Sequence, residues 1–340
     1  MYHEPFVVEV TRGSSVESQH IGAAVVCDVN GNVLESWGDI DQLVFPRSAI
    51  KLLQGIGLIE SGASEHYTLS DAEISLACAS HIGQPMHIER VAEWLKRLGL
   101  KEKQLACGAS LPSDELSAQT LLASGQDCCR LHHNCSGKHA GFMTTALYLQ
   151  QPVEGYHQAA HQVQQSSFDI ISDLAQFKLD PHPKGIDGCG FPAPSLPLRN
   201  LGIAMARFAN PEGLSERRGK AIKRIHHAIT HEPFYLAGAG EVASDLINVT
   251  DGAVLAKTGA EGFFMAALPD RGLGIALKIA DGNPRARSVA LLEILDRLGA
   301  LSETEKKKLS NHIRPKIINS LGQTVGEIRP AFSRVPDQQS

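Results

Sequence analysis

The sequence predicts a mixed α/β (α+β) fold in which both ends of the chain build one sheet and the middle is mainly helical. β-Prone runs gather near the two ends, whereas the segments between them repeat apolar residues at helical spacing. A chain of 340 residues with 43% hydrophobic content can bury a large core, either as one extended domain or as two subdomains.

The clearest strand pattern is a hairpin near the N-terminus, where residues 21–29 and 32–34 are β-prone and Asn30-Gly31 joins them. Further strands are expected at residues 252–257, 263–268, 272–279 and 325–328. Apolar periodicity predicts helices at residues 88–98, 139–149, 163–177, 215–229 and 286–298. The apolar run at residues 74–77 is expected to be one more strand, with Ser80 and His81 at its end.

Charge and composition exclude several classes of function. The formal net charge is -5, and Lys and Arg are scattered, so there is no electrostatic footprint for nucleic acid or an anionic membrane. The N-terminal residues lack a signal-peptide pattern and no run is long enough to span a membrane, so we expect a cytoplasmic protein. Seven irregularly spaced cysteines fit reduced thiols better than a disulfide framework.

Ser48-Ala49-Ile50-Lys51 is a candidate Ser-Lys pair. A serine hydroxyl becomes a good nucleophile only when a neighbour takes its proton, and a residue at i+3 of a helix lies on the same face. Ser48 stands where a helix N-cap is expected, before an apolar periodic run. Lys257 of Lys257-Thr258-Gly259 would be the second cation that lowers the pKa of Lys51. The penicillin-recognising enzymes use S-x-x-K and K-T-G in this order.

Two further segments carry reactive side chains. Ser80 and His81 are neighbours along the predicted strand and would point to opposite faces, so Ser80 needs a partner such as Lys257. Cys135 and Cys189 lie in polar, Gly-containing segments. Two thiolates and one further ligand can hold zinc, whereas the alternative is a pair of free, partly buried thiols.

Taken together, these motifs resemble the asparaginase II-type family of Ser-Lys amidohydrolases. The matching segments are Arg47-Ser48-Ala49-x-Lys51-x-x-Gln54, Cys78-Ala79-Ser80-His81, Cys107-Gly108, residues 134–139, Asp187-Gly188-Cys189 with Pro192, Lys257-x-Gly259-Ala260-Glu261-Gly262, and Lys278-Ile279-x-Asp281-Gly282-Asn283. They run in the family's order over nearly the whole chain.

The resemblance implies a serine-β-lactamase/glutaminase-like fold with an antiparallel sheet built from both chain ends. It implies a single catalytic domain over residues 1–335, followed by a tail at 336–340. The sheet region would cover about 1–82 and 235–335, and the helical region about 83–234. It also implies hydrolysis of L-asparagine to L-aspartate and ammonia, usually by a homodimer.

The resemblance further implies roles for individual residues. Ser48 and Lys51 would form one Ser-Lys pair, and Ser80 and Lys257 the second. Arg47, His139 and Asp187 would surround the substrate, with the Asp187 carboxylate pairing with the α-ammonium. A zinc ion beside the substrate would be held by three side chains, Cys135, Lys138 and Cys189.

The sequence departs from the family pattern at several positions. Leu52 replaces the usual Pro after the motif lysine, and Ser110 replaces a usual His. Glu241 stands where the family commonly has Arg, and Ala243 replaces a third cysteine near the metal. These changes leave the nucleophilic residues in place and alter the expected surroundings of the metal and the substrate.

The leading hypothesis is acyl transfer, in which Ser48 attacks the side-chain amide and Lys51 acts as base. The sequence leaves open which of the two serines attacks. One alternative keeps the Ser-Lys chemistry and changes the substrate to glutamine, another amide or a β-lactam. The other is a non-catalytic member of the fold that binds an amino acid or zinc.

Overall fold

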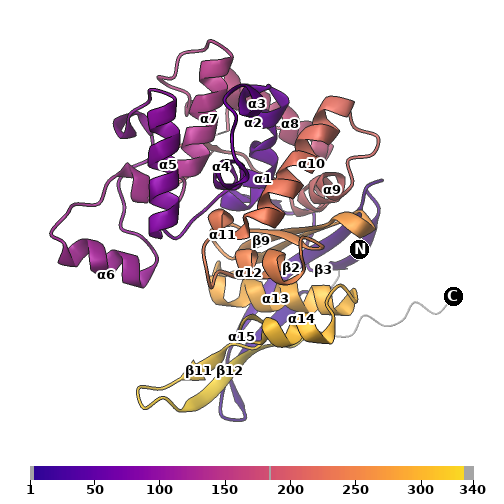
Figure 1. The fold of residues 1–340 in the computed structure, drawn as a ribbon. Coiled ribbons are helices and arrows are strands. Elements are labelled where there is room, and N and C mark those ends of the chain that lie inside the picture. Colours follow the sequence, from indigo (N-terminus) through magenta and orange to yellow (C-terminus); the bar gives the residue numbers. More distant parts are fainter. Residues whose placement is uncertain (1–3, 184, 333–340) are drawn as a thin grey trace.

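The computed structural model describes residues 4–183 and 185–332. Its centre is an antiparallel sheet in the order β11-β12-β1-β2-β10-β9-β8, with β3 also paired to β2 (Figure 1). The strands are β1 Phe6–Arg12, β2 Ser15–Asp28, β3 Val33–Trp37, β8 Leu255–Thr258, β9 Phe263–Leu268, β10 Leu273–Ile279, β11 Lys316–Ile318 and β12 Thr324–Pro330. The first three and the last five come from opposite ends of the chain, which confirms the predicted fold class.

The long strand β2 joins the two ends of the chain, as does the pairing of β1 with β12. It pairs with β1 and β3 from the N-terminal part and with β10 from the C-terminal part. The hairpin to β3 turns through Gly31 at φ 87°, and the Asp28 carboxylate accepts hydrogen bonds from the backbone of Asn30 and Asn32. The predicted Asn-Gly hairpin is therefore confirmed, and its turn is the kind that glycine favours.

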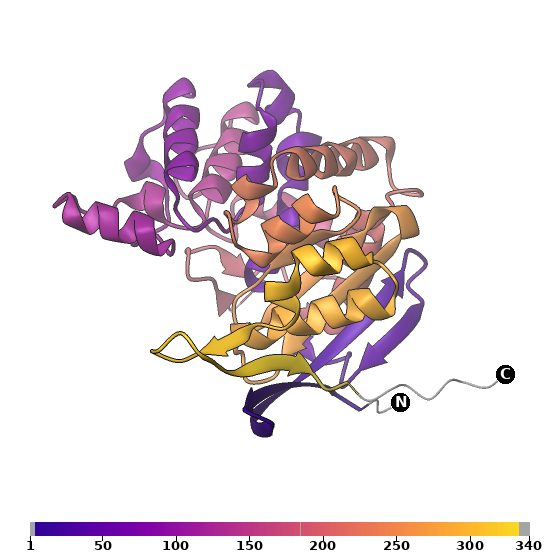
Figure 2. The ribbon, with the colours of Figure 1, turned by 60° about the horizontal axis from the view of Figure 1, so that its bottom comes forward.

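Buried residues of β2 alternate between two cores. Val25 and Cys27 face one apolar cluster, while Ala24 and Val26 face the other, as the period of two of a strand requires. The sheet therefore needs a helical layer on each face. The face that carries Ala24 and Val26 is covered by α12 (Val242–Val249) and α13 (Pro284–Arg297). Helices α14 (Glu303–Lys308) and α15 (Ser310–Ile313) lie beside them (Figure 2).

The first face is covered by α9 (Leu198–Ala209), which lies unusually close to the sheet. A Cβ on Gly274 of β10 would stand 2.1 Å from the Ala206 backbone nitrogen, and one on Gly202 would stand 2.8 Å from Val25. Both positions need glycine because a helix backbone contacts the strands directly.

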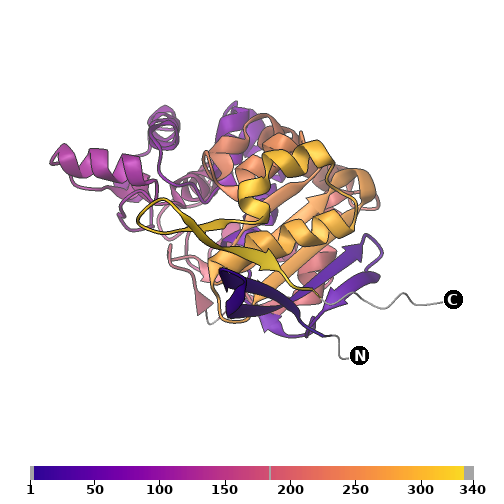
Figure 3. The same ribbon diagram turned by 90° about the horizontal axis from the view of Figure 1, so that it is seen from below.

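The remaining helices form the helical region around α9. They are α1 Lys51–Gln54, α2 Ile56–Glu60, α3 Ala63–His66, α4 Asp71–Ala77, α5 Pro85–Arg97, α6 Glu115–Ala123, α7 Ser136–Tyr148, α8 Gln162–Ala175, α10 Glu216–His231 and α11 Pro233–Leu236. Helix α6 projects away from the rest of the molecule (Figure 3). Two short ladders, β4 (Leu43–Val44) with β7 (Leu196–Pro197) and β5 (Gly185–Ile186) with β6 (Pro192–Ala193), lie outside the main sheet.

The five predicted helices are present as α5, α7, α8, α10 and α13, each within a few residues of its expected limits. One element was predicted wrongly. Residues 74–77 belong to helix α4, because Ser70 and Glu73 form a capping box that starts a helix three residues before the apolar run. The predicted tail at 336–340 lies outside the described residues. None of the described helices is long and apolar enough to cross a membrane.

Candidate active site

Ser80 lies in an extended segment just after α4, held from both sides by backbone hydrogen bonds. Ser80 N donates to Leu236 O at 3.0 Å and Ile82 N to Ala237 O at 2.8 Å, while His81 N donates in the other direction to Asn134 O at 3.1 Å. Successive residues therefore face opposite sides, as expected for Ser80 and His81. His81 is buried and its Nε2 lies 2.8 Å from Ser136 Oγ, which makes it a packing residue beside the site.

The Ser80 hydroxyl lies between two lysines. Lys51 Nζ donates to Ser80 Oγ at 2.7 Å, and Lys257 Nζ lies 3.1 Å from the same oxygen. Both lysine side chains are fully buried. Lys51 reaches the site from the start of α1 and Lys257 from β8, so three segments far apart in the sequence meet at one oxygen.

The Lys51 ammonium makes no hydrogen bond to Ser48. Its three N–H groups are matched by Ala79 O at 2.6 Å, Ser80 Oγ at 2.7 Å and Cys135 Sγ at 3.0 Å. Ser48 lies half-buried in the 3₁₀ turn η1 (Arg47–Ile50), and its hydroxyl forms no hydrogen bond within the described part of the chain. The expected Ser80–Lys257 pair is present, whereas Lys51 lies against Ser80 instead of Ser48.

Lys257 has the environment of a general base. Burial, followed by the positive charges of Lys51 and Arg287, holds its pKa well below the usual value for lysine. Its Nζ also donates to Thr258 O at 2.9 Å. A neutral amine that donates to this carbonyl keeps a lone pair for the Ser80 proton.

Two glycines of the sequence motifs allow close backbone contacts around the site. A Cβ on Gly259, two residues after Lys257, would stand 2.4 Å from Pro46 O. A Cβ on Gly137 would stand 2.4 Å from Leu76 O, at the contact between α7 and α4. Neither φ is positive, so glycine is needed at both positions for the close approach of the backbones and not for the conformation.

Two thiols and a lysine form a buried cluster next to Lys51. Lys138 Nζ donates to Cys189 Sγ at 2.9 Å and lies 3.9 Å from the centre of the Phe191 ring. A hydrogen bond with Cys189, aided by the charges of Lys51 and Lys138, holds the pKa of Cys135 well below its usual value. Burial would lower the pKa of Lys138, but the Cys189 and Cys135 sulfurs outweigh burial and raise it.

The three predicted zinc ligands thus lie together, which is compatible with a metal site. In the described residues no three His, Cys, Asp or Glu side chains meet as metal ligands. A zinc ion would therefore need the Lys138 amine, after loss of its proton, as third ligand. Ala243 is packed in the core of α12 and α13, on the other face of the sheet from the core that contains Cys135 and Cys189.

Of the predicted substrate-binding residues, Arg47 and Asp187 are partly exposed beside this cluster, whereas His139 is buried. Arg47 Nε donates to Asp187 Oδ1 at 2.7 Å, with both side chains partly exposed. Burial alone would raise the pKa of Asp187, but the charges of Lys138 and Arg47 lower it, so the carboxylate stays ionised. His139 is buried, which lowers its pKa to about 4, and its Nδ1 lies 2.5 Å from the Tyr156 hydroxyl.

Sequence reasoning missed three residues that shape the site. Arg287 lowers the pKa of Lys257 and donates to Gly259 O at 2.6 Å. Tyr156 orients His139, and Phe191 packs on both Lys138 and His139. Phe191 adjoins the Asp187-Gly188-Cys189 motif, but nothing in the sequence pattern distinguishes Tyr156 or Arg287.

Comparisons with known proteins identify a family for the chain. The sequence matches the profile of the L-asparaginase II family over residues 8–330. No curated protein matches the chain by sequence.

Several solved structures are similar to the chain at low identity. Native Mglu in 4.3 M NaCl has a TM-score of 0.47 at 14% identity, over 82% of this chain and 61% of that chain. The L-glutamate binding form of Mglu in the same salt has a TM-score of 0.47 at 15% identity, over 82% of this chain and 60% of that chain. A beta-lactamase (Mb2281c) from Mycobacterium bovis has a TM-score of 0.39 at 15% identity, over 86% of this chain and 95% of that chain. This chain therefore spans less than two thirds of the length of these two Mglu chains.

Proposed function

Given that the chain belongs to the L-asparaginase II family of amidohydrolases, we propose that it hydrolyses L-asparagine to L-aspartate and ammonia. The observation that carries the proposal is the Ser80 hydroxyl held between Lys51 and Lys257, at 2.7 and 3.1 Å. A serine with one hydrogen-bond donor and one neutral amine beside it is equipped for covalent acyl transfer.

In the proposed reaction Ser80 Oγ attacks the side-chain amide carbon of asparagine while the Lys257 amine takes the hydroxyl proton. The tetrahedral intermediate collapses as the C–N bond breaks, and Lys257 returns the proton to the leaving ammonia. Water then attacks the resulting ester, again with Lys257 as base, and releases aspartate and the Ser80 hydroxyl. Lys51 donates to Ser80 Oγ and so orients it. Ser48, which has no lysine partner, is the competing nucleophile.

The polar groups around the cluster would orient the substrate. The Nη nitrogens of Arg47 are suited to the α-carboxylate, and Asp187 Oδ2, which accepts only a long contact of 3.9 Å from the Cys189 thiol, is suited to the α-ammonium. His139, neutral at physiological pH because burial lowers its pKa to about 4, would present an uncharged ring beside them. The Arg47–Asp187 bond keeps both charges in place before substrate arrives.

We also propose that Cys135, Lys138 and Cys189 hold a zinc ion. When bound, zinc would supply a fixed positive charge next to the substrate. Binding requires two thiolates and the loss of the Lys138 proton. The hydrogen bond with Cys189 and the charges of Lys51 and Lys138 favour the thiolate at Cys135, whereas the same hydrogen bond and burial raise the pKa of Cys189, and the raised pKa of Lys138 opposes loss of its proton. A homodimer, on the strength of the family alone, and a cytoplasmic location, from the N-terminal sequence, complete the proposal.

The test is ammonia release by the purified protein from L-asparagine and L-glutamine, together with nitrocefin hydrolysis. We expect kcat/KM for asparagine to exceed that for glutamine by about 10-fold or more, because one extra methylene displaces the reacting amide. Preference for glutamine or nitrocefin would make the chain a Ser-Lys hydrolase of another amide. Tight asparagine binding without turnover would make it a non-catalytic binding protein.

A further inference from the structure

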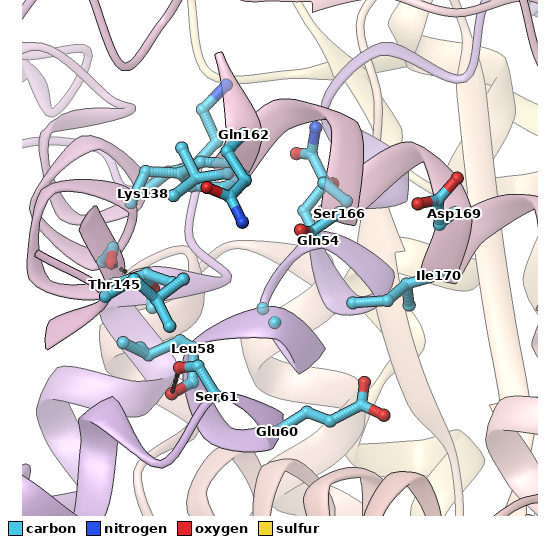
Figure 4. Close-up of a pocket in the computed structure, with 18 of the residues that line it drawn as sticks. Gln54, Leu58, Glu60, Ser61, Lys138, Thr145, Gln162, Ser166, Asp169 and Ile170 are labelled. Carbon is cyan, nitrogen blue, oxygen red and sulfur yellow. Dashed lines mark hydrogen bonds between the residues drawn. The ribbon is translucent and has the colours of Figure 1, made fainter. Parts of the chain in front are cut away.

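His139 and Tyr156 form a buried hydrogen-bonded pair, and no step of the proposed reaction uses either of them. His139 is fully buried and Tyr156 is 1% exposed, and His139 Nδ1 lies 2.5 Å from the Tyr156 hydroxyl oxygen. Lys138, the residue before His139, lines a cavity of about 360 Å³ between α2, α7 and α8 (Figure 4). Neither member of the pair lines this cavity, so it supplies no partner for their polar atoms.

The Tyr156 hydroxyl determines which nitrogen of His139 carries the hydrogen. Burial, with the charge of Lys138, lowers the pKa of His139 to about 4, so the ring is neutral and has a single N–H. The Ala106 backbone N–H donates to the hydroxyl oxygen at 2.9 Å. The hydroxyl has one hydrogen of its own, and in the described residues His139 Nδ1 is its one remaining partner.

Only one placement of the ring hydrogen satisfies these groups. With the hydrogen on Nδ1, two N–H donors would face the Tyr156 oxygen, and the hydroxyl hydrogen would have no acceptor in the described residues. A buried donor without an acceptor costs free energy. Tyr156 therefore donates its hydroxyl hydrogen to Nδ1, and the ring hydrogen of His139 is on Nε2.

The Nε2–H group faces the protein interior. Nε2 has almost no accessible surface and forms no hydrogen bond of ordinary geometry in the described residues, so a substrate atom cannot reach it. The ring of His139 packs on Phe191 with centres 4.5 Å apart, and Lys138 Nζ lies over the same Phe191 ring and donates to Cys189 Sγ. A hydrogen bond with Cys135 and burial raise the pKa of Cys189, and contact with His139 acts in the opposite direction. The Cys189 sulfur is therefore the acceptor beside Nε2–H.

We propose that Tyr156 is a positioning residue that holds His139 as its Nε2–H tautomer, with Nε2–H directed at the Cys189 sulfur. A donor at this place favours the thiolate form of Cys189. The lone pair of the ring is on Nδ1 and is held by the hydroxyl, so His139 cannot bind zinc through Nε2, although imidazole is a common zinc ligand. The amine of Lys138 is then the nitrogen left for the metal. This last consequence rests on the proposed metal site, whereas the tautomer does not.

The tautomer is measured by long-range ¹H–¹⁵N NMR of the purified protein with ¹⁵N-labelled histidine, before and after treatment with a chelator. His139→Gln identifies the His139 signals by their loss. We expect Nε2, the nitrogen that couples strongly to both ring C–H protons, to have the chemical shift of a protonated nitrogen, and Nδ1 that of an unprotonated one. The opposite assignment would overturn the proposal.

Tyr156→Phe removes the hydroxyl and keeps the ring. The ratio of the Nε2–H to the Nδ1–H tautomer of His139 should fall about 10-fold, because one hydrogen bond to Nδ1 is lost. The matched control is Tyr148→Phe, at a half-buried tyrosine of α7 whose hydroxyl forms no hydrogen bond in the described residues, and it should leave the ratio unchanged. An unchanged ratio in Tyr156→Phe, with a thermal transition that shows a folded protein, would contradict the role of Tyr156.

Addition of zinc to the chelator-treated protein tests the consequence for the metal. We expect Nε2 of His139 to stay protonated when zinc is bound. Loss of the Nε2 hydrogen on zinc binding would make His139 a ligand and overturn the proposal. The metal content of the same sample is measured separately, so a protein that binds no zinc would count against the metal site alone, since the NMR spectrum without metal decides the tautomer.

Discussion

Lys51 Nζ donates to Ser80 Oγ at 2.7 Å, although Lys51 stands only three residues from Ser48 and 29 residues from Ser80. A buried ammonium needs an acceptor for each of its three N–H groups, and Ala79 O, Ser80 Oγ and Cys135 Sγ supply them. Because Lys257 meets the same oxygen at 3.1 Å, Ser80 is the serine that we propose as nucleophile.

The first prediction concerns the two serines. Ser80→Ala should lower kcat for asparagine by about 1,000-fold or more, because the attacking oxygen is removed. Ser48→Ala should lower it less than about 10-fold, since no lysine contacts that hydroxyl. Steady-state ammonia release by both variants shows which serine is the nucleophile, and circular dichroism shows that each variant is folded. The reverse pattern of losses would return the nucleophile role to Ser48.

The second prediction concerns the base. Below its depressed pKa Lys257 is protonated and cannot accept the Ser80 proton, so kcat/KM should rise with pH through that pKa. Arg287→Gln removes one of the charges that lower the pKa of Lys257, and the acidic limb should move to higher pH by up to about one unit. Arg287→Lys keeps the charge and is the control. An unmoved limb in Arg287→Gln would exclude Lys257 as the titrating base.

The third prediction concerns recognition of the α-ammonium. Asp187→Asn keeps the shape of the side chain but removes its charge, so KM for asparagine should rise about 10- to 100-fold. Succinamate, which is asparagine without the α-amino group, is the diagnostic substrate. The wild type should strongly prefer asparagine to succinamate, and the variant should lose most of that preference. A variant that keeps it would show that Asp187 does not contact the ammonium.

The fourth prediction concerns the metal. The purified protein should bind about one zinc ion per chain, and Cys189→Ser should bind it at least about 10-fold more weakly. Affinity should fall as pH decreases, because thiolate and amine ligands must lose protons to bind. Metal content after dialysis against zinc measures this directly, with Cys128→Ser as a control outside the cluster. No bound zinc in the wild type would contradict the proposed ligand set.

Much of the fold could be predicted because its signals are local. Asn30-Gly31 sets the hairpin between β2 and β3, and the spacing of apolar residues sets helices such as α8 and α13. The error at residues 74–77 has a physical reason. A short apolar run fits a buried helix as well as a strand, and the Ser70–Glu73 capping box decided for the helix.

The sequence by itself determined which side chains are present for the chemistry and in which order, from Ser48 and Lys51 through Ser80 and Cys135 to Lys257. The tertiary structure decided which of them meet. Gly259 lets the end of β8 approach the turn before Lys51, and Gly137 lets α7 approach α4, the helix before Ser80. Lys51 and Lys257 then meet at the Ser80 oxygen. The pKa of Lys257 depends on the same packing, because burial and the charges of Lys51 and Arg287 act through distance in space and not through spacing along the chain.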